Sequence, residues 1–130
     1  GGTYSENPLA CAAGLATLDE MTDAHLAAWG EQYAVTLLTR YEQWQAHKLS
    51  PYLGQLTGVG AMRGIELLTP EGKPATAQMA QLLASARERG LLLMPSGKAR
   101  HIIRLLAPLT IEPEVLNEGL DILEVCLADL

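Results

Sequence analysis

Residues 101–107 read HIIRLLA, and this apolar stretch indicates how the chain folds. Its apolar side chains occupy both alternating positions, whereas a strand with one face in water alternates apolar with polar residues. We therefore expect a strand that other elements cover on both faces. Arg104 stands inside it, and a permanently charged guanidinium in such a place needs an anionic partner or an exit to water.

Three interpretations of Arg104 are open on the residues alone. Its planar guanidinium matches a carboxylate through two parallel hydrogen bonds, which is how an arginine binds an acidic ligand. It could equally form a structural ion pair, for example with Glu66 on a neighbouring strand. It could also be an arginine at a strand end that faces water.

The elements around this stretch predict an α+β fold. Gly90 is the kind of residue that ends a helix, and Pro113 the kind that begins one. The periodicity predicts helices from Asn7-Pro8 to about residue 18, from Asp23 to about His47-Lys48, over 75–89 and from Pro113, and strands over 61–68, 91–94 and 101–107. This order suits a small, partly antiparallel sheet of about three strands with helices on one face, preceded by one or two long helices.

Composition narrows the classes of function. The 130 residues carry a formal net charge of -6, which disfavours binding to nucleic acids and to anionic membranes. No apolar run approaches the roughly 18 residues of a membrane span. Cys11 and Cys126 show no metal-binding spacing and are most simply reduced thiols, which predicts a cytoplasmic protein.

The segment before the first helix is a second candidate site. A helix N-terminus presents free N–H groups and the positive end of the helix dipole, and glycines let the backbone approach a phosphate. Thr3 could add its hydroxyl to such a site. An ordinary capped helix start, with Asn7 as the cap and Pro8 in the first turn, explains the same residues without any ligand.

No residue of the chain is predicted to be catalytic. A lysine that carries a cofactor covalently must be desolvated and held rigidly. Lys48 lies near a helix end, whereas Lys73 and Lys98 lie in glycine-containing loops, so all three are expected to be exposed. The histidines have no metal-ligand spacing, and no metal site is expected.

Several segments together resemble the class III (omega-amino-acid) aminotransferases. Residues 2–10, GTYSENPLA, resemble the Gly-Thr-(Tyr/Phe)-small-Gly-Asn-Pro motif of that family, with Glu6 standing where the family has glycine. The likeness continues in order through residues 58–62, 89–92, 103–111 and 118–123 and spans essentially the whole chain. It is stronger to the 4-aminobutyrate branch than to the ornithine branch.

The resemblance implies the C-terminal part of a fold-type I enzyme that uses pyridoxal 5′-phosphate. Residues 1–48 would form the phosphate-side loop and connecting helices, and residues 49–130 the small C-terminal domain. Gly2 and Thr3 would bind the cofactor phosphate of the neighbouring subunit in a homodimer, and Arg104 the carboxylate of the amino acid or 2-oxo acid. The parent would transfer an amino group from an omega-amino acid such as 4-aminobutyrate to a 2-oxo acid such as 2-oxoglutarate.

The resemblance also implies that the catalytic lysine lies upstream of Thr3, outside the 130 residues. The chain alone is therefore expected to be an inactive piece of a longer enzyme. The alternative is a non-catalytic ligand-binding or interaction domain with the same fold. The sequence upstream of Gly1 separates the two, because only the enzyme requires a lysine a few tens of residues before Thr3.

Overall fold

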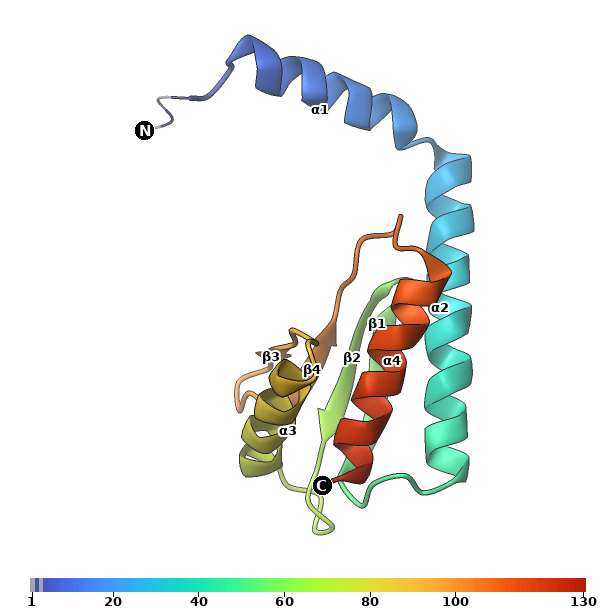
Figure 1. The fold of residues 1–130 in the computed structure, drawn as a ribbon, viewed down its shortest axis with the longest axis vertical. Helices are drawn as coiled ribbons and strands as arrows, with labels where there is room; N and C mark the ends of the chain where they lie inside the picture. Colours follow the sequence, from blue (N-terminus) through green and yellow to red (C-terminus); the bar gives the residue numbers. More distant parts are fainter. Residues whose placement is uncertain (1, 3) are drawn as a thin grey trace.

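The computed structural model describes residue 2 and residues 4–130, which form four helices and four strands (Figure 1). In chain order these are α1 (Pro8–Glu20), α2 (Asp23–Ala46), β1 (Leu53–Val59), β2 (Met62–Leu67), α3 (Thr76–Glu88), β3 (Met94–Ser96), β4 (Ile102–Leu105) and α4 (Pro113–Ala128). The predicted α+β class is confirmed, with four strands in place of about three.

Short side chains set the starts of the two long helices. Asn7 accepts a hydrogen bond from the Ala10 backbone N–H, and Pro8 occupies the first helical turn of α1. Thr22 performs the same function for α2 by accepting from the His25 N–H, and α2 begins at Asp23, as predicted. Asp23 lies in the first turn, where its negative charge suits the helix dipole.

The strands form one antiparallel sheet in the order β1-β2-β4-β3. Strand β1 was not predicted, because its glycines and polar residues resemble a loop. It turns into β2 through Gly58, whose φ is 94°, and a Cβ there would lie 2.1 Å from the Met62 carbonyl oxygen. Arg63 holds this turn by donating to the carbonyls of Gly58 and Gly60.

Strand β3 lies at Met94–Ser96 and not at the predicted residues 91–94. The Leu91 N–H bonds back to the Ala86 carbonyl and closes the end of α3. Pairing with β4 begins only at Met94, opposite Arg104. Apolar residues alone therefore located the strand three positions too early.

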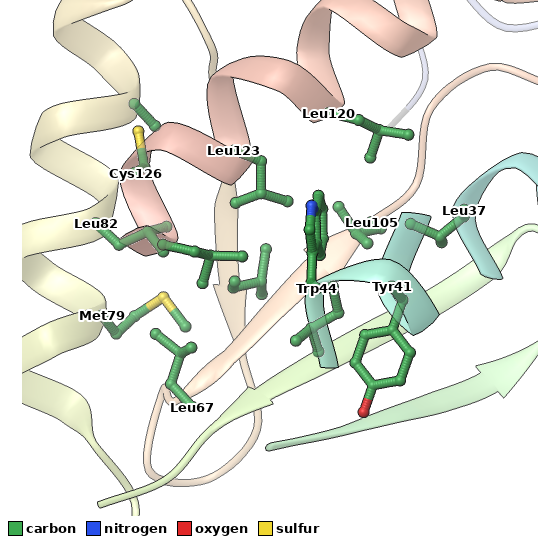
Figure 2. Close-up of a cluster of buried hydrophobic side chains, with 14 of the residues drawn as sticks. Leu37, Tyr41, Trp44, Leu67, Met79, Leu82, Leu105, Leu120, Leu123 and Cys126 are labelled. Carbon is green, nitrogen blue, oxygen red and sulfur yellow. The ribbon is translucent and has the colours of Figure 1, made fainter. Parts of the chain in front are cut away.

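Helices α2, α3 and α4 cover one face of the sheet and leave the other face open. Ile65 and Leu67 of β2 and Ile103 and Leu105 of β4 point into the core, where they are at most 8% exposed. Figure 2 shows this core, to which α2 contributes Trp44, α3 contributes Leu82 and α4 contributes Leu123. The expectation that β4 is covered on both faces is wrong for the described residues, because no helix lies on its second face.

Polar contacts fix α2 against its neighbours. The Tyr41 hydroxyl donates to the Gly54 carbonyl and accepts from the Leu56 N–H of β1. On α4, Glu124 Oε2 accepts from the Trp44 indole at 2.6 Å and from Arg40 at 3.1 Å. Arg40 also donates to Asp121, and this hydrogen bond is the main reason that the pKa of Arg40 is raised.

Helix α1 has no buried residue and extends away from the sheet at the far end of α2 (Figure 1). Its leucines are exposed in spite of their size, and Leu9, for example, is 84% accessible. Across residue 2 and residues 4–130, none of the helices combines the length and apolarity needed to cross a membrane.

The core of the helical layer predicts a difference between two Leu→Ala substitutions. Leu123 of α4 is 1% exposed, whereas Leu9 of α1 is 84% exposed. We expect Leu123→Ala to lower the free energy of unfolding by about 2–5 kcal/mol through lost burial and a cavity. Leu9→Ala should change it by less than about 0.5 kcal/mol. Urea denaturation of the 130-residue chain measures both, and equal losses would contradict this core.

Candidate functional site

Arg104 lies in the centre of the open face of the sheet. The register places Thr57, Gly64, Arg104 and Met94 in one row across β1, β2, β4 and β3. Directly paired residues of antiparallel strands point to the same face, so this row is on the side away from the helices. Arg104 is exposed there, and a carboxylate can approach its guanidinium without displacing another residue.

The ion pair between Arg104 and Glu66 does not form. Glu66 shares the open face but pairs with Ile102, two residues along the strands from the Gly64–Arg104 pair. The Arg104 side chain makes no hydrogen bond or salt bridge with any described residue. Within the described residues Arg104 faces water, as the third interpretation expected, because its face of β4 is open. Arg104 is thus an unpaired cation on an otherwise mostly apolar strand.

Two glycines, Gly64 and Gly97, leave room for the Ile102 side chain on the open face near Arg104. A Cβ at Gly64 would lie 2.7 Å from Cγ2 of Ile102, and one at Gly97 would lie 2.9 Å from its Cδ1. The Ile102 side chain therefore fills the space above both glycines. This close approach was not predicted from the sequence, although an isolated glycine inside a strand is a known signal of it.

The second candidate site lies at the N-terminus of α1, but Thr3 itself is outside the described residues. Around it, the Ser5 N–H donates to the Gly2 carbonyl at 2.9 Å, and Asn7 Nδ2 donates to the Tyr4 carbonyl at 2.9 Å. A Cβ on Gly2 would lie 1.8 Å from Ser5 Oγ, so the turn closes tightly over the glycine. The loop is compact and leads directly into the capped helix.

Glu6 has a backbone conformation that favours glycine. Its φ is 61°, in the left-handed region that side chains other than those of Asn and Asp rarely adopt. The resemblance placed a glycine of the family motif at this position. The left-handed turn gives a physical reason for that glycine, and Glu6 carries both the strain and a negative charge next to the helix N-terminus.

The described residues suit the phosphate side of a pyridoxal-phosphate site, and they do not include a buried lysine. The tight turn at Gly2 and the positive end of α1 are chemically suited to an anion. Lys48, Lys73 and Lys98 are all exposed. The two candidate sites are not brought together either, because the N-terminal loop lies at the far end of α1 from the sheet (Figure 1).

An apolar hollow of about 350 Å³ opens between β3, β4 and α4. Leu92, Leu106 and Val115 contribute to its wall, and Arg104 is the one charged residue among those that line it. This hollow was not predicted from the sequence, because it forms where β3 and β4 diverge and depends on tertiary structure.

The chain matches the family model described as aminotransferase class-III over residues 1–127. It is 68% identical over its whole length to a 2-aminoadipate transaminase of Pseudomonas putida, of which it covers 31%. It is also 35% identical to the 4-aminobutyrate aminotransferase GabT of Escherichia coli, where 97% of the chain covers 30% of the relative. The chain thus spans less than a third of the length of these relatives.

Solved structures agree in fold. A phospholyase from Arthrobacter in complex with phosphoethanolamine superimposes on 95% of the chain with a TM-score of 0.82 and 31% identity, over 29% of its own length. An aminotransferase of Bacillus anthracis covers the same share of the chain with a TM-score of 0.79 and 26% identity, and 29% of its own length is matched.

The isolation of Arg104 predicts unequal effects for two Glu→Gln substitutions. Glu66→Gln should change the free energy of unfolding by less than about 0.5 kcal/mol, because Glu66 has no ion pair. Glu124→Gln removes the charge that accepts from Trp44 and Arg40 and should cost about 1.5–3 kcal/mol. Chemical denaturation at neutral pH compares them. A loss at Glu66 as large as that at Glu124 would indicate an ion pair with Arg104.

Proposed function

Because the chain belongs to the class-III aminotransferase family, we propose that it is the C-terminal part of a pyridoxal-phosphate transaminase and supplies the arginine that binds the substrate carboxylate. The observation that carries this proposal is Arg104, an exposed guanidinium without an acidic partner on the open face of the sheet. The match over residues 1–127 supports it. The chain covers only 31% of its 2-aminoadipate transaminase relative, so the activity belongs to a longer parent enzyme.

Each candidate residue has a distinct task in this proposal. Arg104 binds and orients the carboxylate of the amino acid and then that of the 2-oxo acid. Gly2 and Thr3 hold the cofactor phosphate with backbone and hydroxyl groups at the N-terminus of α1. When bound, pyridoxal phosphate acts as the electron sink that allows the amine-bearing carbon to lose a proton. Glu6 must direct its carboxylate away from the phosphate, since the two anions repel.

We assign residues 1–48 to the phosphate-side loop and connecting helices, and residues 49–130 to the small C-terminal domain. We also propose that the parent is a homodimer in which the first loop reaches the neighbouring subunit. Helix α1 supports this, because it exposes leucines and alanines along its whole length and buries no residue. A helix that is apolar around its circumference requires partners on several sides.

The substrate is proposed to be a linear amino acid that ends in a carboxylate, with 2-aminoadipate as the first candidate and 2-oxoglutarate as amino acceptor. The relative named for 2-aminoadipate is 68% identical, whereas the 4-aminobutyrate and 5-aminovalerate enzymes are 34–38% identical. These substrates are chemically related, because 2-aminoadipate is 5-aminovalerate with an added carboxylate on the amine-bearing carbon. 4-Aminobutyrate, the expectation from the sequence, becomes the second candidate.

A non-catalytic binding domain is the competing proposal, and the exposure of all three lysines favours it. A lysine upstream of Gly1 in the parent distinguishes the enzyme from this alternative. We also propose the cytoplasm as the compartment. Cys11 supports this, because it is a free and exposed thiol, and such thiols persist in reducing compartments.

Substitution of Arg104 in the full-length enzyme tests the carboxylate role. Arg104→Ala should reduce kcat/KM for 2-aminoadipate by a factor of about 30 to several thousand. This factor corresponds to about 2–5 kcal/mol, the range for removing one partner of a desolvated charge pair. Arg100→Ala is the matched control, because Arg100 is an exposed arginine in the loop before β4. Unchanged steady-state kinetics in the Arg104 variant, or equal losses in both, would contradict the assignment.

The 130-residue chain mixed with pyridoxal phosphate should form no specific lysine adduct. All of its lysines are exposed, and none has the desolvated surroundings that stabilise an imine. Absorbance spectroscopy followed by borohydride reduction and peptide mapping provides the measurement. Stoichiometric trapping at one lysine would show that the chain carries its own cofactor-binding lysine.

A further inference from the structure

The ladder between β3 and β4 stops at the edge of the apolar hollow. Its last pair is Met94 with Arg104, and the same register would continue with Leu93 opposite Leu105 and then Leu92 opposite Leu106. Neither Leu92 nor Leu106 makes a backbone hydrogen bond to any described residue. The two segments diverge here, and the hollow of about 350 Å³ lies beside them.

Large apolar side chains surround these unpaired peptide groups. Leu92 is 82% exposed, Leu106 48% and Val115 54%, and all three line the hollow. A single exposed leucine is ordinary on a protein surface, but an apolar hollow flanked by unpaired strand backbone is typical of an interaction site. Arg104 alone is charged among the lining residues, so an uncharged occupant fits the interior of the hollow.

We propose that an extended, apolar segment of the same longer polypeptide enters this hollow as an additional strand. Its backbone would lie between Leu92 and Leu106 and pair with both, and alternate side chains would fill the hollow. The inference rests on the proposed function in one respect, namely that the chain is part of a longer enzyme. The Arthrobacter phospholyase superimposes on 95% of this chain, but the match covers only 29% of the phospholyase. A polypeptide of that length has ample further sequence to supply the strand.

Two other occupants fit less well. A second copy of the chain would have to offer its free β1 edge, but β1 contains a register shift between Leu53 and Leu56 and has the left-handed Gly58 next to its last residue. Irregular edges of this kind discourage pairing between sheets. A small apolar ligand would fill the volume but leave the peptide groups of Leu92 and Leu106 unpaired.

Amide hydrogen exchange tests the proposal without an activity assay. In the full-length protein, the amides of Leu92 and Leu106 should exchange at least about tenfold more slowly than in the 130-residue chain, while the core amide of Ile103 serves as the reference. Equal exchange in both proteins would overturn the proposal and favour a small ligand or an empty hollow. Protection in the 130-residue chain that rises with its concentration would also overturn it, in favour of a second copy.

A matched pair of substitutions provides the second measurement. Leu92 and Val59 are 82% and 83% exposed, but only Leu92 lines the hollow. Leu92→Asp should lower the Tm of the full-length protein by several degrees more than Val59→Asp, whereas in the 130-residue chain the two variants should melt alike. Equal effects in the full-length protein would contradict the added strand. A full-length protein with this protection but without transaminase activity would refute the proposed function and leave the strand intact.

Discussion

The burial of Ile103 and Leu105 beneath the helices determines the orientation of every other side chain of β4. Each buried side chain contributes about 1.5–3 kcal/mol relative to exposure. A one-residue slip of β4 would turn both toward water and bring Arg104 into the core. An unpaired buried guanidinium costs several kcal/mol more. Apolar burial and the cost of burying a charge therefore favour the same register, which places Arg104 on the open face beside Gly64.

Much of this arrangement could be predicted, because helical periodicity and helix-start residues are local signals. The four helices and strand β2 all followed from such patterns. Strand β1 was not predicted, because it contains two glycines and few residues with high β-propensity. It lies at the edge of the sheet, and Gly58 leads into the hairpin turn to β2. The predicted position of β3 was three residues too early, because the end of α3, and not strand pairing, determines the conformation of Leu91.

The surroundings of Arg104 could not be predicted from the sequence. The expected need for an anion assumed a strand covered on both faces, whereas the exposure of Arg104 depends on which face of the sheet the helices cover. The same holds for Gly64 and Gly97, whose closeness to Ile102 arises from strands and loops that are distant in sequence. Glu6 shows the converse, because one backbone angle of 61° explains a glycine that the family motif has at this position.

Packing of helices on one face of the sheet does not explain the apolar residues on the open side of β4. Ile102 lies on the same side as Arg104, away from the core, and Leu106, just beyond the end of β4, is 48% exposed. A segment that faces water would carry polar residues at these positions. Helix α1 and Leu92 show the same excess of exposed apolar surface. The chain therefore has one complete core and several apolar surfaces that remain uncovered. This pattern is expected if Arg104 works inside a larger protein, since a carboxylate is bound more strongly by an arginine from which neighbouring chain has excluded water.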